Sequence, residues 1–146
     1  MVFTEAGDVS NAEEQLLSAV HYVQKVQRIS NDEQIHHETG YWIWEQSTKK
    51  VTHCLVIPRG MSLLEAGVFV ENSAINSTIT FDVKACIDEV NWQLIQSPFM
   101  QKNARMSKYF QQFILTGNKL SYTQSMILDI YGKVFEHTDQ NTLIRQ

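Results

Sequence analysis

The sequence has few of the residues that cross-link or interrupt a chain. It holds two cysteines, two prolines and six glycines among 146 residues. Cys54 and Cys86 stand alone and far apart, without the short C-x-x-C spacing of a zinc ribbon or a redox pair. We interpret them as reduced thiols of a cytoplasmic protein, and we favour that interpretation over a disulfide.

Basic clusters and long apolar runs are also missing. The chain has 12 lysines and arginines against 16 acidic residues, which gives a formal net charge of −4. No basic cluster could neutralise several phosphates, so we expect no nucleic-acid partner. The apolar runs are far shorter than the ~20 residues of a membrane helix. The opening MVFTEAGDVS has no charged segment followed by an apolar one, so we expect neither a secretory signal nor a membrane partner.

Length and composition predict one domain. A chain of 146 residues suits a single hydrophobic core. The composition, 43% hydrophobic and 19% charged, is that of an ordinary globular protein. No internal repeat, low-complexity segment or linker interrupts the sequence. We therefore predict a single domain over residues 1–146.

Short alternating or β-branched runs dominate the chain after residue 36. The segments ETGYWIWE, VTHCLVIPRG and SLLEAGVFVE each predict a strand, and Gly67 in the third segment predicts a bulge. The segment STITFDVKACID alternates cleanly, with Phe81 and Val83 on one face. Gly117 and Asn118 predict a hairpin between two longer strands.

The tract QLLSAVHYVQKVQ allows two interpretations. The residues from Ser10 to Glu13 form a capping-box pattern ahead of it, which is typical of a helix start. Yet Val20, Val23 and Val26 favour a strand, and a turn cluster follows them. The local pattern leaves the choice between helix and strand open.

The spacing of the short strands predicts an all-β fold, an antiparallel β-barrel of the lipocalin or fatty-acid-binding-protein type. Closed barrels hide their strand edges and can hold one small ligand inside. Alternate residues from Leu120 to Ile130 share one face, and Gln124 lies on that otherwise apolar face. A glutamine lining a cavity and a core glutamine with a backbone partner are both compatible with this position.

The common catalytic signatures are missing, including the nucleophile elbow, the P-loop and H-E-x-x-H. His36 and His37 are adjacent, and adjacent strand residues point to opposite faces, so a shared zinc ion is disfavoured. For His21 we favour a surface or hydrogen-bonded position, and for His53 core packing. His36 and His137 are the remaining candidates, because a neutral imidazole is the usual axial ligand to haem iron.

Three segments follow one another along the chain: HHETGYWIWE, LVIPRGMSLLEAG and FILTGNKLSYTQSMILDIYGKVFEHTDQNTLIRQ. Together they resemble the nitrobindin-type haem-binding β-barrel family, also described as fatty-acid-binding-protein-like. The family pattern runs from H-x-E-T-G-x-W through P-x-G to a terminal L-x-Y-x-x-x-M hairpin, a histidine and a closing L-x-R. The match covers residues 16–146 and rests on the ordered set of motifs.

The resemblance implies an antiparallel barrel that binds ferric haem b through an axial histidine on the last strand. His137 matches that ligand, and His36, Ile57 and Met126 would line the haem side of the pocket. Family members bind nitric oxide and can isomerise peroxynitrite, so a peroxynitrite isomerase-like activity is implied if haem is bound. The resemblance also implies that residues 16–30 form a strand.

Three departures from the family pattern bear on these expectations. The chain has no G-x-W-x-G-x-G segment, so we expect a barrel that is incomplete at the N-terminus, with an open edge that a second copy could pair with as a homodimer. Matching from the C-terminus places the ligand position on Thr138 instead of His137. A slip of one residue turns a side chain to the other face, and a bulge could restore it. Ile57 stands where relatives often carry a polar residue.

A second hypothesis is a non-haem carrier of a fatty acid or another apolar ligand in the same barrel. Such carriers fix the ligand carboxylate with a basic side chain inside the barrel. The candidates are Arg28, Arg59, Arg105 and Arg145. A third hypothesis is a family member that has lost its ligand.

Overall fold

The structure is a computed structural model that describes residues 1–69 and 78–145. Ten strands and one helix lie within those residues. The elements are β1 (Val2–Asn11), β2 (Gln15–Gln27), β3 (Gln34–Glu45), β4 (Lys50–Ile57), β5 (Met61–Val68), β6 (Thr78–Cys86), β7 (Leu94–Gln96), α1 (Pro98–Asn103), β8 (Ala104–Thr116), β9 (Lys119–Ile130) and β10 (Lys133–Ile144). Val70, Glu71 and Ser77, at the ends of two predicted strand segments, lie outside the described residues.

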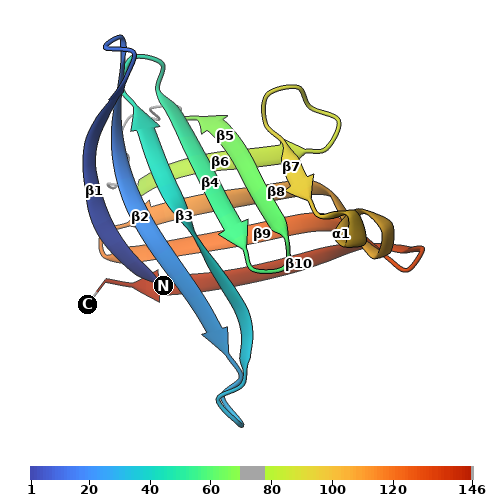
Figure 1. The fold of residues 1–146 in the computed structure, drawn as a ribbon. Helices are drawn as coiled ribbons and strands as arrows, with labels where there is room; N and C mark the ends of the chain where they lie inside the picture. The colour runs from blue at the N-terminus through green and yellow to red at the C-terminus, as the bar shows by residue number, and fades with distance from the viewer. Residues whose placement is uncertain (70–77, 146) are drawn as a thin grey trace.

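The strands form one curled antiparallel sheet in the order β1-β2-β3-β4-β5-β6-β8-β9-β10, with β7 paired to β5. The strands β1 to β5 make one half of the sheet, and β6 and β8 to β10 run across their direction in the other half (Figure 1). The two halves meet at β5 and β6, whose described residues pair only through Ala66 and Lys84. The prediction of an all-β antiparallel barrel is thereby confirmed.

The barrel is open between β1 and β10. Within the described residues each of these strands pairs on one side only, β1 with β2 and β10 with β9. The start of the chain and the end of β10 lie near each other, because Met1 lines the same cavity as Leu120, which pairs with Leu143. Figure 1 shows the arrangement of these strands. The expected incompleteness of the barrel is therefore confirmed for the described chain.

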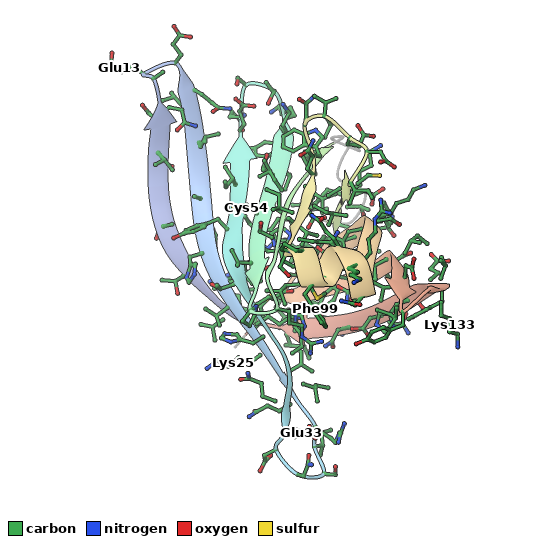
Figure 2. The ribbon with its side chains drawn as sticks, turned by 45° about the vertical axis from the view of Figure 1, so that its right-hand side comes forward. Glu13, Lys25, Glu33, Cys54, Phe99 and Lys133 are labelled. Carbon is green, nitrogen blue, oxygen red and sulfur yellow. The ribbon has the colours of Figure 1, made fainter. Side chains whose placement is uncertain are left out.

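Residues 15–27 form a strand, as the family resemblance implied. The capping-box residues lie instead in the β1–β2 hairpin, where Ala12 and Glu13 adopt positive φ angles of 51° and 62°. The strand β2 runs between the turns that carry Glu13 and Glu33, which lie at opposite ends of the molecule (Figure 2). Pairing with both β1 and β3 decides its conformation, because cross-strand packing outweighs weak local propensity.

Two elements have no counterpart among the sequence expectations. The strand β1 was not predicted, because its residues are almost all exposed and show no clean alternation of apolar side chains. The helix α1 was also not predicted. Its start carries a recognisable signal, since the Ser97 hydroxyl accepts a hydrogen bond from the Met100 N–H and Pro98 follows at the first helical position.

Gly67 does not form the predicted bulge. The pairing of β4 with β5 runs without a register shift. The glycine is instead a point of close approach, because a Cβ atom there would lie 1.6 Å from the backbone oxygen of Asp82 on β6. Only a residue without a side chain fits where the two halves of the sheet cross. The predicted hairpin at Gly117 and Asn118 is confirmed, between β8 and β9.

Two apolar clusters fill the concave side of the sheet. The larger one gathers buried side chains from both halves, including Leu55 and Leu63, and the smaller one contains Val83, Phe113 and Tyr122. Alternation along β6 places Val83 inside, as the sequence predicted. In the described part of the chain, no helix has the length and apolar character needed to cross a membrane.

Candidate functional site

The four residues predicted from the sequence line one cavity of about 450 Å³. His36 comes from β3, Ile57 from the end of β4, Met126 from β9 and His137 from β10. The remaining apolar lining includes Met61, Met100, Met106, Leu128, Ile130 and Phe135. The polar lining includes Glu38, Arg59, Tyr109, Gln124 and Asp139. The cavity size lies within the range of about 300–1,000 Å³ that is typical of small-molecule sites.

His137, and not Thr138, faces this cavity. The strands β9 and β10 pair in unbroken register, with His137 opposite Met126. Alternate residues Phe135, His137 and Asp139 line the cavity, so Thr138 belongs to the other face of the strand. The His137 side chain is exposed and makes no hydrogen bond with residues 1–69 or 78–145. Its ring nitrogens are free to bind a ligand.

His36 is held by a carboxylate. Its Nε2 lies 2.9 Å from Oε2 of Glu38, two residues along the same face of β3. His37 is not part of the cavity wall. Among the described residues, no group of three or more histidine, cysteine, aspartate or glutamate side chains is arranged to hold a metal ion.

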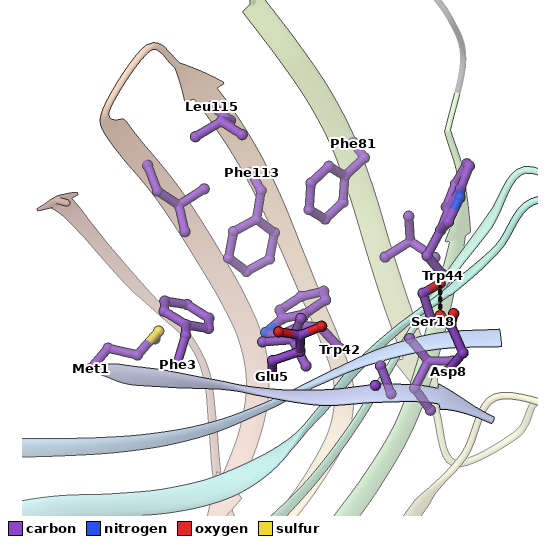
Figure 3. A pocket seen from close by; sticks show the side chains of 16 residues that line it. Met1, Phe3, Glu5, Asp8, Ser18, Trp42, Trp44, Phe81, Phe113 and Leu115 are labelled. Carbon is purple, nitrogen blue, oxygen red and sulfur yellow. Dashed lines mark hydrogen bonds between the residues drawn. The ribbon is translucent and has the colours of Figure 1, made fainter.

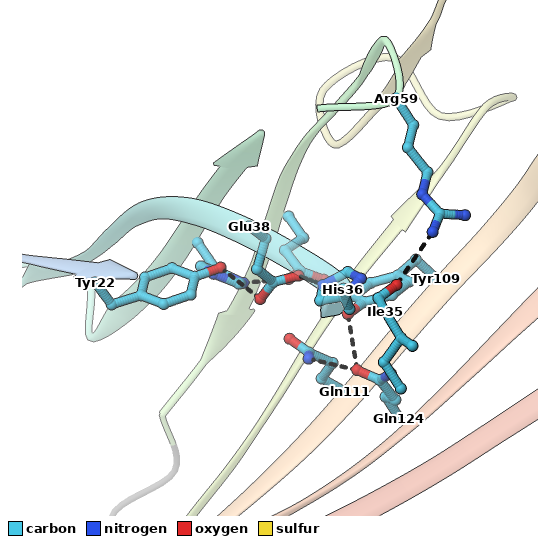
Figure 4. Close-up of polar contacts among 10 residues, drawn as sticks. Tyr22, Ile35, His36, Glu38, Arg59, Tyr109, Gln111 and Gln124 are labelled. Atoms are coloured by element: carbon cyan, nitrogen blue, oxygen red, sulfur yellow. Dashed lines mark hydrogen bonds and ion pairs between the residues drawn. The ribbon is translucent and has the colours of Figure 1, made fainter. Parts of the chain in front are cut away.

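A buried chain of polar side chains runs from the core to the cavity wall. Oε1 of Glu65 lies 2.5 Å from Nδ1 of His53, and His53 Nε2 lies 2.8 Å from the Tyr22 hydroxyl. That hydroxyl donates to Oε1 of Glu38 at 2.9 Å, and Glu38 also binds His36 (Figure 4). His53 is buried, as predicted, and its ring stacks on Trp42 with centroids 3.8 Å apart.

Burial keeps the inner members of this chain uncharged. Burial lowers the pKa of His53 to about 3, because a charged imidazolium would lose its hydration. Burial also raises the pKa of Glu65 well above its usual value, and the nearby charge of Glu38 adds to the shift. The pKa of Tyr22 is raised for the same two reasons. Both shifts favour the uncharged forms, a neutral imidazole at His53 and a carboxylic acid at Glu65.

Gln124 lines the cavity and is also hydrogen-bonded. Its side-chain oxygen accepts from the Tyr109 hydroxyl at 3.0 Å and from the Gln111 amide at 3.1 Å (Figure 4). Both partners of this oxygen are side chains, and not the backbone partner that was one of the two possibilities considered from the sequence. The oxygen of Gln111 is buried without a hydrogen bond to the described residues.

A second cavity, of about 600 Å³, lies along β1, the strand at the open edge of the sheet. Trp42, Phe81 and Phe113 form part of its wall, and Phe3 and Glu5 of β1 border it (Figure 3). It is more apolar than the first cavity and contains no histidine. This second cavity adjoins the open edge of the sheet and has few side chains that could bind a metal or a cofactor. We therefore take the histidine-lined cavity as the candidate site.

Sequence reasoning missed the inner polar residues Tyr22, Glu38 and Glu65. A signal existed for Glu38, because it stands two residues from His36 and therefore shares its strand face. Glu65 and His53 are cross-strand partners in β5 and β4, a relation that requires the strand register. Their contact with Tyr22 and Glu38 depends on the curvature of the whole sheet.

Comparison with known proteins adds a family and a fold. The model of the "THAP4-like, heme-binding beta-barrel domain" family matches residues 1–145. The crystal structure of Rv2717c from M. tuberculosis is similar with a TM-score of 0.65 and 19% sequence identity. The similarity covers 90% of this chain and 80% of that chain. At this identity it demonstrates a shared fold. No curated protein matches the sequence.

Proposed function

Because the chain belongs to the family of THAP4-like, haem-binding β-barrel domains, we propose that it binds haem b in the histidine-lined cavity. His137 is the proposed axial ligand to the iron, and His36, Ile57 and Met126 are proposed to line the haem pocket. The observation that carries the assignment is the free imidazole of His137 on the wall of a largely apolar cavity.

The residues around the cavity fit this group. Haem is a large apolar ring that needs a neutral imidazole and apolar walls. Four methionines, Met61, Met100, Met106 and Met126, supply adaptable apolar contacts. Of the two cavity-lining imidazoles, His36 is engaged with Glu38, which leaves His137 the better donor.

The proposed reactivity is toward nitric oxide or peroxynitrite. Bound haem would supply a ferric iron with a position open to such small ligands. The chain itself would orient the group through His137 and limit water through its apolar wall. A peroxynitrite isomerase-like activity would need no catalytic acid, base or nucleophile from the protein, which agrees with the lack of such motifs in the sequence.

An alternative is a carrier of a fatty acid or another small apolar ligand. One observation favours it: of the four candidate arginines, Arg59 lines the same cavity. Arg28, in contrast, is paired with Glu33 at the surface. A carboxylate at the rim could bind Arg59 while its apolar tail fills the cavity.

Replacing His137 by alanine is expected to weaken haemin binding by at least about 100-fold, because even an outer-shell partner of a metal ligand costs about 10–100-fold. The measurement is a haemin titration of the apo-protein that follows the Soret band. Thr138→Ala is the matched control. The Thr138 side chain is next to His137 in the sequence but points to the other face of β10, so this variant should bind haemin like the wild type. A normal Soret band in His137→Ala would overturn the ligand assignment. The carrier hypothesis would be favoured by two results together. The wild type would show no Soret shift, and it would bind a fluorescent fatty acid tightly while Arg59→Ala would not.

A further inference from the structure

The polar chain from Glu65 to Glu38 joins the barrel core to the cavity without a break. Its four members are almost fully buried: Glu65 is 0% exposed, His53 and Tyr22 are each 1% exposed, and Glu38 is 6% exposed. Only Glu38 also lines the cavity. Three hydrogen bonds of 2.5 to 2.9 Å link the four side chains one after another, from Glu65 through His53 and Tyr22 to Glu38. No lysine or arginine takes part in these bonds.

When Glu38 is the charged end, counting hydrogens gives one direction for the hydrogen bonds of this polar chain. Tyr22 has one hydroxyl hydrogen, which it donates to Glu38. His53 must then donate from Nε2 to the Tyr22 oxygen. A neutral His53 therefore accepts at Nδ1, so Glu65 is the carboxylic acid that donates to it. The four hydrogen-bonded side chains then carry one negative charge, which lies on Glu38 beside the cavity.

The same chain has a second, equally complete arrangement. Glu65 can pass its proton to Nδ1 of His53, while Nε2 of His53 passes its proton to the Tyr22 oxygen and Tyr22 passes its own to Glu38. Glu65 is then a carboxylate and Glu38 a carboxylic acid. The proton count and total charge are unchanged, and every bond of the chain is kept with its direction reversed.

The environment favours the first arrangement when the cavity holds no anion. Both oxygens of Glu38 have partners, Tyr22 and His36. One oxygen of Glu65, Oε2, is buried with no hydrogen bond to the described residues, which is costly for a carboxylate. Burial of Glu65 acts in the same direction by raising its pKa. An anion near Glu38 would oppose this preference by repulsion.

We infer that Glu65, His53, Tyr22 and Glu38 form a proton relay that adapts the cavity to small anionic ligands. A proton moved outward from Glu65 neutralises Glu38 and withdraws the negative charge into the core. The other titratable groups near this path are His36 on β3, Arg59 after β4, Tyr109 on β8, Tyr122 on β9, and His137 and Asp139 on β10. Within the described residues none of them is hydrogen-bonded to Glu65, His53 or Tyr22, since His36 binds Glu38 and Tyr109 binds Gln124. For its ligand class the inference rests on the proposed function, since peroxynitrite is an anion.

The relay itself is tested on the apo-protein near pH 6. We expect nitrogen NMR of the histidine rings to show His53 protonated at Nε2 and unprotonated at Nδ1. We also expect an infrared band of a buried carboxylic acid that disappears in Glu65→Gln and remains in Glu38→Gln. An imidazolium at His53, or a carboxylic-acid band that survives in Glu65→Gln, would overturn the relay.

The anion preference is tested on haemin-loaded protein with azide as the charged probe and imidazole as the neutral one. Tyr22→Phe keeps the ring but cannot pass a proton, so Glu38 stays charged and azide affinity should fall about tenfold, as for one unit of pKa. Imidazole affinity should stay within about twofold of the wild type. The double variant Tyr22→Phe/Glu38→Gln should recover azide affinity, because the charge that the relay removes is then absent.

Each failure points to a different step. Equal loss of azide and imidazole affinity in Tyr22→Phe, or no recovery in the double variant, would contradict the anion role, since a purely structural defect would do the same. Wild-type protein that takes up no haemin would count against the proposed function and against the anion role that rests on it. The NMR and infrared results would still decide whether the relay exists.

Discussion

The protein is expected to be most stable between about pH 4.5 and 6.5, and to lose stability on both sides as a result of the His53–Glu65 pair. Below this window the unfolded chain protonates both groups, whereas the folded chain keeps His53 neutral down to a pKa of about 3. Above it the unfolded chain has released both protons, whereas folded Glu65 retains one because its pKa is raised. Inside the window the two states bind equal numbers of protons.

On each side of the window the unfolded and folded states differ by one bound proton. The free energy of unfolding should therefore fall by about 1.4 kcal/mol per pH unit away from the window. The free energy of unfolding, measured by urea denaturation across the pH range, checks it. Glu65→Gln is the matched variant, since its amide can still donate to His53 but cannot ionise. The difference between wild type and variant isolates Glu65, so it should be constant below about pH 4.5 and should fall as the pH rises above that value. An alkaline limb that persists unchanged in the variant would contradict the assignment.

Replacing Gly67 by alanine is expected to lower the free energy of unfolding by at least about 3 kcal/mol, at the upper end of overpacking costs. The new Cβ would lie 1.6 Å from the backbone oxygen of Asp82, so β5 and β6 would have to separate. Within the described residues these strands share one backbone pair, Ala66 with Lys84, so few hydrogen bonds of the sheet oppose their separation.

Gly7→Ala provides the comparison for this variant. Gly7 has a φ of +83° but open space around its Cβ position, so the change should cost only the roughly 1–2 kcal/mol of left-handed backbone. Chemical denaturation of both variants gives the two values. If Gly67→Ala were no less stable than Gly7→Ala, the close crossing of the strands would not limit the fold.

Local sequence patterns predicted the strands whose residues alternate and the turns that join them. The alternation around Val83 and the hairpin at Gly117 could be predicted because each depends on residues only a few positions apart. The ordered motifs also pointed to the family and, within it, to His137 and the three other pocket residues. These inferences need the order of residues along the chain but no knowledge of which strands pair.

Features that depend on contacts between distant strands became visible only in the folded molecule. The pairing of β9 with β10 determined that His137, and not Thr138, faces the cavity, since a shift of one residue reverses every side chain. Pairing on both sides made residues 15–27 a strand, and the crossing of β5 and β6 explained Gly67. The chain from Glu65 to Glu38 joins four strands, β5, β4, β2 and β3, so only the curvature of the sheet brings its members together.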